Sequence, residues 1–199
     1  MGARRQEHTR DELEALVVDA AEAIAGREGL GGVTMRRLAA AIGYAPNSIY
    51  HAVGDMDAIV LRLNARTLDR MTRSLKRRLA EAGDGAAAVD ALVEGYMAFV
   101  HRNAGLWSGI VDYARPDKGP LPAWYEAALA RPLALVDGAL APFFPDADDR
   151  RRSTAVLWAG LHGIASLAVS GKLGVVTGDD ALPLARLLVH RYLAGREAA

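Results

Sequence analysis

Residues 34–53 read TMRRLAAAIGYAPNSIYHAV and constrain the fold more than any other part of the chain. Thr34 can cap a short helix, because its hydroxyl can accept a hydrogen bond from an unpaired amide of the first turn. Gly43 can end that helix, since glycine adopts the left-handed cap conformation at little cost. Pro46 then suits the first turn of a second helix over 45–51, where a missing amide costs little. The stretch therefore predicts a helix-turn-helix, whose second helix reads the major groove of DNA.

This stretch resembles the DNA-binding core of the TetR family of bacterial transcriptional regulators, and the resemblance extends over about residues 9–75. Family members usually read T-x-R-x-L-A-x-x-x-G-V-S, then a small residue, L-Y-x-H-F and a Lys that opens the next helix. The residues that match are Thr34, Arg36, Leu38, Ala39, Gly43, Ile49 and Tyr50. Three residues depart from the pattern: Ala52 replaces a His, Val53 replaces the commonest Phe, and Met56 replaces the usual phosphate-contacting Lys. The last departure affects one contact with the DNA backbone and leaves the expected fold unchanged.

The composition is typical of a helical globular protein. The 199 residues are 51% apolar, too many for a disordered chain, and the strong helix formers Ala, Leu and Arg dominate. No cysteine is present, so disulfides, thiolate metal sites and cysteine nucleophiles are excluded. The chain has no long uncharged apolar run, and its first residues lack the apolar core of a signal peptide. We therefore expect a cytoplasmic protein without a membrane span.

Basic and acidic residues balance, with 24 of each, which by itself argues against a DNA-binding protein. Basic residues are in slight excess over 1–80, however, and acidic residues are in slight excess over 81–199. This asymmetry has the expected sign, because basic groups that meet phosphates supply much of the affinity for DNA. Charge alone would not identify a DNA-binding half without the motif.

Apolar residues recur with helical spacing along almost the whole chain. Thr9 and Glu12 have the spacing of a capping box that opens the first helix. After the helix-turn-helix, helices are expected over about 56–80, 86–103, 105–113, 123–140, 148–172 and 180–194. The predicted fold is therefore all-α with about nine helices. It comprises an N-terminal three-helix helix-turn-helix domain (1–55), a linking helix (56–80), and a C-terminal helical domain (81–199), to which the resemblance assigns ligand binding and dimerisation.

Three local features of the second half lead to specific expectations. Pro132 should kink or interrupt its helix, because proline removes a backbone hydrogen bond and crowds the preceding turn. Asp148 or Asp149 should open the following helix. Gly174–Gly178 should form a turn between the last two long helices.

Those last two long helices are apolar on two sides. One face of 150–172 carries Trp158, Leu161, His162, Ala165 and Val169, and another carries Leu157, Gly160, Ile164, Leu167 and Gly171. A helix that is apolar on both sides must bury both. We expect the surplus faces to pack against a second copy as a two-fold four-helix bundle, with Gly160 and Gly163 allowing close approach. The alternative is that both faces fill the core of a monomer. WAGLHG at 158–163 also resembles the Trp-x-x-x-His-Gly signature of one TetR-type C-terminal domain class.

The candidate DNA-binding residues are Thr34, Arg36, Ala45, Pro46, Asn47, Ser48, Tyr50 and His51. Asn47 can pair with adenine through two hydrogen bonds, Ser48 can donate or accept, and Pro46 can touch a thymine methyl. The resemblance implies that Arg36 reads a base and that Tyr50 contacts a phosphate. Thr34 would combine a cap with a phosphate contact, the alternative being a cap only. The alternative for Tyr50 is a packed aromatic, and His51 either approaches the DNA or has no specific role.

The sequence leaves the roles of several other arginines open. Arg4, Arg5 and Arg10 could reach phosphate or the minor groove as a basic arm, or form a solvated tail. A stripe on the long helix comprises Arg62, Arg66, Arg70, Arg73 and Arg77. This stripe could be a basic rail, but it runs away from the recognition helix, and we interpret it as a solvated face.

The resemblance implies that the second domain binds a small molecule. The candidate ligand-binding residues are Met97, His101, Trp107, Tyr113, Trp124, Tyr125, Trp158 and His162. Aromatic and histidine side chains offer apolar walls with a few polar groups, although core packing explains each of them equally well. His162 needs a polar partner, which a backbone carbonyl could also supply. No spacing of ligands supports a metal site, and we expect no cofactor.

The function implied by the resemblance is a ligand-responsive transcriptional regulator, in the first instance a repressor, that binds a palindromic operator as a homodimer. The alternative is a helical interaction module of the same fold without sequence-specific DNA binding, which the altered segment 52–56 favours. An enzyme is not expected, since the chain has no Gly-rich phosphate loop, nucleophile elbow or paired-ligand helix, and no catalytic residue is proposed.

Overall fold

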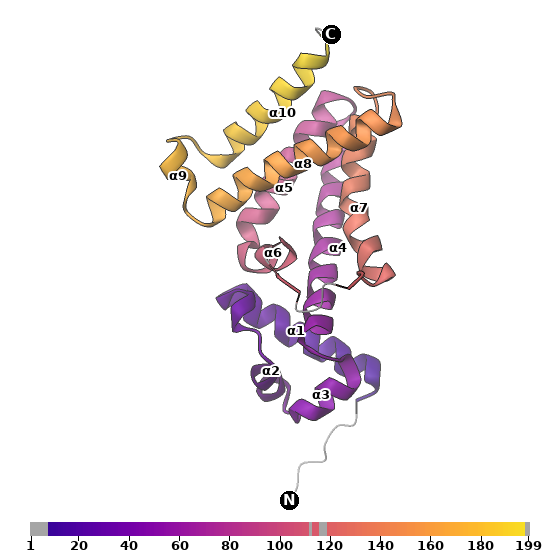
Figure 1. The fold of residues 1–199 in the computed structure, drawn as a ribbon, viewed down its shortest axis with the longest axis vertical. Coiled ribbons are helices and arrows are strands. Elements are labelled where there is room, and N and C mark those ends of the chain that lie inside the picture. Colours follow the sequence, from indigo (N-terminus) through magenta and orange to yellow (C-terminus); the bar gives the residue numbers. More distant parts are fainter. Residues whose placement is uncertain (1–7, 112, 116–118, 198–199) are drawn as a thin grey trace, which may run out of the picture. The chain divides into compact units, whose positions relative to one another are not determined.

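The computed structural model describes residues 8–111, 113–115 and 119–197. Over these ranges the chain forms ten α-helices, one short 3-10 helix and no strand (Figure 1), which confirms the predicted all-α class. The helices are α1 (Arg10–Glu28), η1 (Leu30–Gly32), α2 (Met35–Ile42), α3 (Pro46–Val53), α4 (Met56–Ala82), α5 (Ala86–Arg102), α6 (Ala104–Val111), α7 (Ala123–Leu140), α8 (Ala147–Val169), α9 (Leu173–Val176) and α10 (Ala181–Glu197). No helix in the described part of the chain is long and apolar enough to cross a lipid bilayer.

The chain divides into two compact units that are not simple halves of the sequence. The first unit comprises Met1–Thr67 and Gly105–Leu121, and the second comprises Leu68–Ala104 and Pro122–Ala199. The first unit thus contains α1 to α3, the first part of α4 and nearly all of α6. The second contains the rest of α4 together with α5 and α7 to α10. The functional domain limits predicted above, 1–55 and 81–199, remain predictions.

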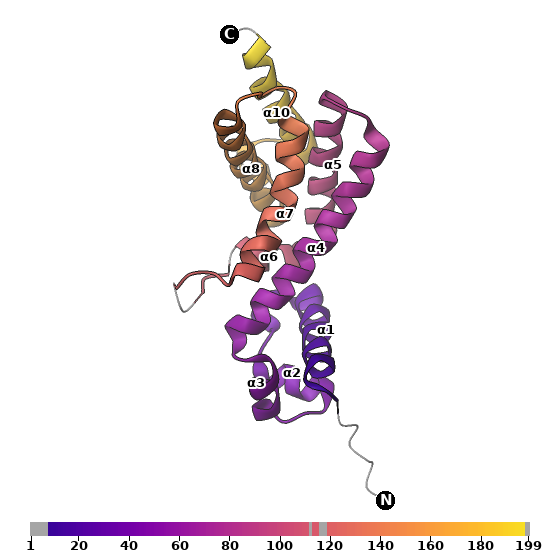
Figure 2. The same cartoon turned by 90° about the vertical axis from the view of Figure 1, so that its right-hand side faces the viewer.

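In the first unit, α1, α2 and α3 pack against one another beside the first turns of α4 (Figure 2). Their shared core includes Val17, Leu38, Ile49 and Ile59, whose side chains are fully buried. Burial of one such side chain stabilises the fold by about 1.5–3 kcal/mol. Gly105 brings α6 onto the end of α1, because a Cβ at this position would lie 2.5 Å from the carbonyl oxygen of Ala25.

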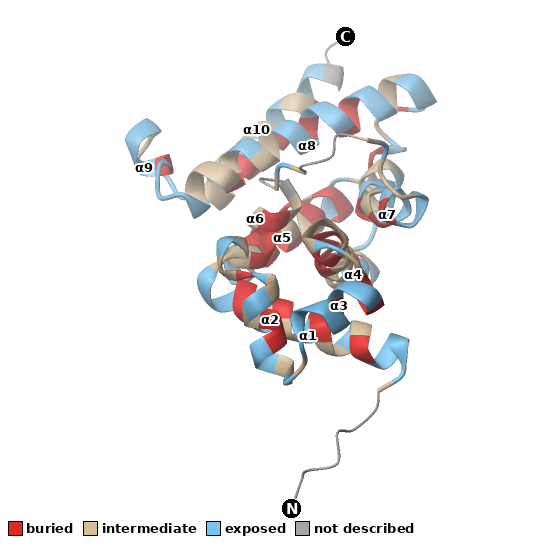
Figure 3. Cartoon of the chain, turned by 60° about the horizontal axis from the view of Figure 1, so that its bottom comes forward, coloured by how far each residue is buried: buried red, intermediate tan, exposed pale blue. Residues whose placement is uncertain are grey.

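In the second unit, α5 packs against α7, α8 and α10, and α8 also packs against α7 and α10. The fully buried side chains include Val100, Leu140, Phe144 and Val189. Several large apolar side chains nevertheless stay exposed on α7 to α10, and the ribbon of α9 is largely exposed in Figure 3. This unit therefore leaves apolar surface uncovered in a single chain.

Two local expectations for the second unit differ from the structure, and one of the two alternatives for a third, the interruption of a helix at Pro132, is wrong. The helix α8 is capped by Asp146, whose carboxylate accepts from the Asp149 amide at 2.8 Å, so neither Asp148 nor Asp149 opens it. The expected turn at Gly174–Gly178 contains the short helix α9, which brings the number of α-helices to ten. Pro132 does not interrupt α7, which continues through it with the proline ring buried.

Candidate nucleic-acid interface

The two helices of the predicted helix-turn-helix begin and end through local hydrogen bonds. The Thr34 hydroxyl accepts from the Arg37 amide at 3.3 Å and caps α2, as predicted. Gly43 ends α2 in the left-handed conformation, with φ of 73°, and the Tyr44 amide then donates to the Ala39 carbonyl at 3.0 Å. Ala45 is the extended residue before α3, and Pro46 occupies the first turn. These caps set the short turn that holds α3 against α2.

Burial divides α3 into two faces. Ile49, Ala52 and Val53 point into the core of the first unit. The outer face is exposed and carries Ala45, Pro46, Asn47, Ser48, Tyr50 and His51. The Tyr50 side chain is 56% exposed, so the alternative of a packed core aromatic is wrong. The structure thus brings the predicted DNA-binding residues of this helix together on one solvent-facing surface.

The adjacent arginines of α2 have different environments. Arg36 is exposed and makes no hydrogen bond or ion pair with any residue that the structure describes. Arg37 instead donates through Nη2 and Nη1 to the two carboxylate oxygens of Glu28, at 2.5 and 2.6 Å, and to the Gly32 carbonyl at 3.0 Å. The hydrogen bonds from Arg37 lower the pKa of the Glu28 carboxyl. Arg37 therefore ties α2 to the end of α1, and Arg36 remains available to a ligand.

The arginine stripe on α4 is mainly structural at its start. Arg62 pairs with Glu14 at 2.9 Å, and Arg66 pairs with Asp19 and, at 3.4 Å, with Glu22. These ion pairs hold α4 against α1 within the first unit. The interpretation of Arg62 and Arg66 as part of a solvated face is therefore wrong. Because both guanidinium groups are paired, they do not form a basic rail either. Arg73 and Arg77, in the second unit, are exposed as predicted.

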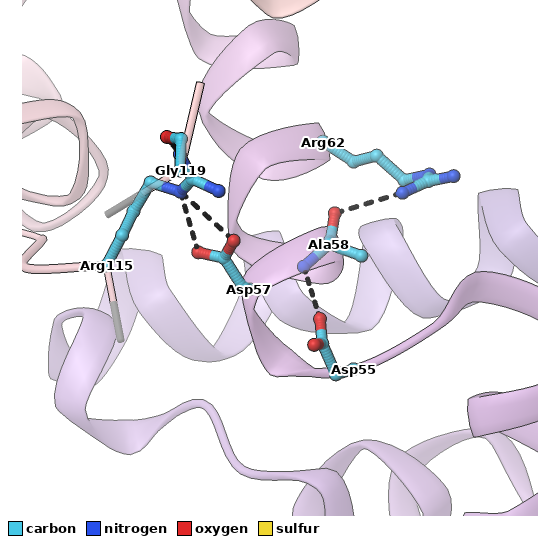
Figure 4. A network of polar contacts seen from close by, with 6 residues as sticks. All are labelled: Asp55, Asp57, Ala58, Arg62, Arg115 and Gly119. Carbon is cyan, nitrogen blue, oxygen red and sulfur yellow. Dashed lines mark hydrogen bonds and ion pairs between the residues drawn. The ribbon is translucent and has the colours of Figure 1, made fainter. Parts of the chain in front are cut away.

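A second polar network surrounds the first turn of α4 (Figure 4). Asp55 caps the helix by accepting from the Ala58 amide at 2.9 Å. Asp57 accepts from Arg115 Nε at 3.1 Å, and Arg115 Nη1 donates to the Gly119 carbonyl at 3.0 Å. Both side chains of this ion pair are mostly buried, with 18% and 16% exposed. The network attaches the segment after α6 to the helix that follows the recognition helix.

Two of the three departures from the TetR pattern lie in the core. Ala52 and Val53 are buried, and Met56 packs against the same cluster. Small and apolar side chains at these positions therefore serve packing. Met56 carries no charge and so cannot pair with a DNA phosphate as a Lys at this position could.

Sequence reasoning missed two contacts near the start of α1, one with the end of α3 and one with the turn before α3. Arg10 Nε donates to the Ala52 carbonyl at 2.9 Å. His8 Nδ1 lies 2.6 Å from the Tyr44 hydroxyl. Both contacts join residues more than 30 positions apart, so no local pattern could have revealed them. Arg4 and Arg5, the other arginines of the predicted arm, lie outside the described residues.

The structure divides the eight predicted ligand-binding residues between the two units. Trp107 and Tyr113 belong to the first unit, and the other six (Met97, His101, Trp124, Tyr125, Trp158 and His162) belong to the second. Trp107 is buried. Burial, together with the carboxylate of Asp57, raises the pKa of the Tyr113 hydroxyl. These two residues therefore do not lie with the other six in one compact unit.

Within the second unit, only part of the set is grouped. Trp158 and His162 stack with ring centres 5.1 Å apart, and His162 Nδ1 lies 3.3 Å from the Tyr96 hydroxyl. Tyr96 is thus a polar partner of His162. Trp124 contacts Tyr125 edge-to-face, Met97 is buried and His101 is exposed. Among the described residues, no three His, Asp or Glu side chains are grouped closely enough to hold a metal ion.

Comparison with known families agrees with this architecture. Residues 17–63 match the sequence model of the bacterial regulatory proteins of the tetR family. Residues 89–192, just over half of the chain, match the tetracyclin repressor-like C-terminal domain. Membership of the Trp-x-x-x-His-Gly class within such domains remains a prediction.

The chain is similar in sequence to two proteins that are named as transcriptional regulators. The chain is 25% identical over 184 residues to the uncharacterized HTH-type transcriptional regulator Rv0681 of Mycobacterium tuberculosis, covering 91% of this chain and 80% of that protein. It is 34% identical over 126 residues to the HTH-type transcriptional repressor DrrR1 of Streptomyces coeruleorubidus, covering 61% of this chain and 44% of that protein.

Solved structures share the fold. A protein of unknown function from Rhodococcus sp. RHA1 has a TM-score of 0.75 at 22% identity, over 97% of this chain and 98% of that one. The TetR family repressor AlkX from Dietzia sp. has a TM-score of 0.52 at 17% identity, over 100% and 99%. The family consists of transcriptional regulators and not of enzymes. The chain belongs to the TetR family of bacterial regulatory proteins and is a DNA-binding transcriptional regulator.

Proposed function

We propose that this regulator is a ligand-responsive repressor that binds a palindromic operator as a homodimer. The observation that carries the proposal is the exposed outer face of α3, held in place by a core on its inner face. A rigid helix with exposed polar residues near its start suits the major groove. Repression is supported by the similarity to DrrR1, which is a transcriptional repressor.

In this proposal, two residues of α3 and one of α2 read bases. Asn47 pairs with an adenine, Ser48 makes a single hydrogen bond, and Arg36 binds a guanine through its two acceptors. Ala45 and Pro46 present apolar groups to thymine methyls. Thr34, Tyr50 and His51 lie at the edges of this surface, where they contact backbone phosphates that fix its register.

The homodimer would form through α8 and α10. Exposed apolar side chains on these helices include Val156, Trp158, Val169 and Leu187, of which Leu187 is 53% exposed. Gly160 serves the packing of α8 against α10 within one chain, since a Cβ there would lie 2.6 Å from Leu188. Gly163 has open space around its Cα and supports close approach of a second chain. A two-fold bundle of these four helices would bury the exposed set.

An effector would bind in the second unit and weaken operator binding. Tyr96, Trp158 and His162 provide two aromatic faces and two polar groups, a chemistry that suits a planar ligand with hydrogen-bonding substituents. Coupling between two sites is typically about 1–3 kcal/mol, so the effector would lower DNA affinity by about 5- to 150-fold.

Selection of bound duplexes from a random library tests this proposal. We expect an inverted repeat whose half-sites are centred about one helical turn apart, ~34 Å. Arg36→Ala should relax the preference at one symmetric pair of positions. Arg27→Ala, which removes an exposed arginine from the far end of α1, should leave the preference unchanged. Failure to enrich any sequence at low salt would contradict the proposal.

The interaction module without DNA binding is the second candidate. It was favoured by the altered segment 52–56, whose buried side chains serve the core of the first unit. If the protein is such a module, Arg36→Ala would leave its affinity for a protein partner unchanged. The protein would also show no salt-dependent binding to any DNA duplex.

A further inference from the structure

The start of α1 is bonded to the end of the recognition helix, and the residue before the α1 cap contacts the turn that precedes this helix. Arg10 Nε donates to the carbonyl of Ala52, in the last turn of α3, at 2.9 Å. His8 Nδ1 lies 2.6 Å from the hydroxyl of Tyr44, two residues before α3. The position of α3 is therefore linked to the first turn of α1 as well as to the core.

That first turn is itself firmly held. The Glu12 amide donates to the Thr9 hydroxyl at 3.3 Å, and the Thr9 amide donates to the Glu12 carboxylate at 2.7 Å. This reciprocal capping box fixes the backbone from which the Arg10 side chain extends. Leu13 and Val17 then anchor the helix in the core.

Arginines in the first unit fall into two groups. Four are paired with carboxylates: Arg37 with Glu28, Arg62 with Glu14, Arg66 with Asp19 and Glu22, and Arg115 with Asp57. Three form no ion pair with any described residue, and these are Arg10, Arg27 and Arg36. All three are exposed. Of these three arginines, only Arg10 is bonded to α3 itself, and Arg36 lies on α2, the helix that packs against α3.

The chemistry of Arg10 suits two simultaneous contacts. A guanidinium has five N–H donors, and the bond to Ala52 uses only the one on Nε. Its positive charge also favours the carbonyl end of α3, where the helix dipole is negative. The two terminal nitrogens remain for an anion, and their planar fork matches a phosphate.

We propose that Arg10 binds a DNA backbone phosphate through its terminal nitrogens while its Nε holds the end of α3. This inference rests on the proposed operator binding. It assigns to Arg10 the backbone contact that Met56 cannot supply. Because one side chain joins the phosphate to the recognition helix, Arg10 would set how α3 is seated in the groove as well as add affinity.

The two roles can be separated by substitution. In Arg10→Gln the amide nitrogen takes the place of Nε, so the bond to Ala52 can form, but the terminal nitrogens and the charge are lost. In Arg10→Lys the charge remains and the Nε donor is lost. Arg27→Gln is the matched control, because it removes the same charge from an exposed arginine at the other end of α1.

The experiment measures the affinity of the full chain for its selected duplex by fluorescence anisotropy between 50 and 200 mM salt. Each lost phosphate contact lowers the slope of log affinity against log salt by about 0.9. A dimer has two copies of Arg10, so we expect Arg10→Gln to lower this slope by about 1.8. Raising the salt concentration from 50 to 200 mM should then weaken the binding of the variant about tenfold less than it weakens the binding of the wild type. Arg10→Lys should keep the slope but weaken binding at every salt concentration, and Arg27→Gln should match the wild type. Thermal melting checks that each variant is folded.

The outcomes are distinct. A wild-type slope in Arg10→Gln, or an equal loss in Arg27→Gln, overturns the phosphate contact while leaving the proposed function intact. Wild-type affinity in Arg10→Lys overturns the role in seating α3. Absence of any salt-dependent duplex binding by the wild type overturns the proposed function, and the inference with it.

Discussion

The two compact units differ in what they expose. Among the described residues, the first unit exposes one large hydrophobic side chain, that of Tyr50 on the recognition helix. In the second unit the exposed ones are Trp124, Leu133, Val156, Trp158, Val169, Val175, Val176 and Leu187. A polar surface with unneutralised arginines suits a polyanion, whereas a large exposed apolar surface is typical of contact with another protein. The comparison indicates that the units meet different partners.

The distribution of charge supports the same distinction. In the first unit, most arginines away from α3 form ion pairs, and these pairs join α1 to α2 and α4. Arg10, which is bonded to α3, and Arg36, on the adjacent helix α2, form no ion pair with any described residue. A chain with no net charge can thus still present local positive charge where DNA would lie.

The largest expected effect is a difference in stability between substitutions on the two faces of α3. Ile49→Ala removes a fully buried side chain and should lower the free energy of unfolding by about 2–5 kcal/mol. Tyr50→Ala, one residue along, should change it by about 0.5 kcal/mol at most while weakening operator binding. Urea denaturation of the two variants measures this difference. Equal destabilisation would mean that the two faces are not divided as described.

The next effect concerns the apolar surface of the second unit. If the proposed homodimer forms through α8 and α10, Leu187→Glu should raise its dissociation constant by about 30-fold or more, because a charge would be buried in that interface. Ala127→Glu places the same charge on the exposed surface of α7 and should leave dimerisation unchanged. Sedimentation velocity over a concentration series measures both. If both variants weakened dimerisation equally, an interface on α8 and α10 would be contradicted.

A smaller effect compares a buried ion pair of the first unit with an exposed one of the second. Arg115→Ala leaves the mostly buried carboxylate of Asp57 without its ion-pair partner and should cost about 1.5 kcal/mol of stability. Arg151→Ala removes the exposed pair with Asp148 and should cost less than about 0.5 kcal/mol. Thermal denaturation distinguishes them, and a larger cost for Arg151→Ala would contradict the comparison.

The smallest effect is the pH dependence contributed by the capping box. Hydrogen bonds from the Thr9 amide and hydroxyl lower the pKa of the Glu12 carboxyl below 4.5. The unfolded chain therefore takes up this proton more readily, and the contribution to stability is present above about pH 4.5 and lost as the pH falls through the folded pKa. Glu12→Gln should make the acid limb of the stability curve shallower. Thr9→Ala should raise the pKa of Glu12 only in part, because the amide donor remains, and carbon-detected NMR titration measures it.

Local chemistry made the helix-turn-helix predictable. The hydroxyl of Thr34, the left-handed conformation of Gly43 and the fixed ring of Pro46 each act within a few residues, and the structure has all three as expected. Three aspartates within four residues made the start of α8 ambiguous, and the first of them, Asp146, is the cap. Glycines at 174 and 178 obscured α9, a single turn of helix.

Long-range contacts could not be predicted in the same way. The return of residues 105–121 to the first unit depends on contacts such as Asn64 Nδ2 donating to the Gly109 carbonyl at 2.6 Å, across 45 positions. The pairing of Arg66 with Asp19 spans a similar separation. A single sequence shows which residues carry charge, but it does not show which of them meet. The exposed surface of α3 was therefore predictable, and the hydrogen bond from Arg10 to the Ala52 carbonyl at the end of α3 was not.

The central claim is that the exposed face of α3 reads DNA sequence. The most direct test is a parallel selection of duplexes by the wild type and by Asn47→Ala, both at the same salt concentration. The account predicts an inverted repeat for the wild type and, for the variant, loss of preference at the same one or two base pairs in each half-site. Identical preferences for the two proteins would contradict it.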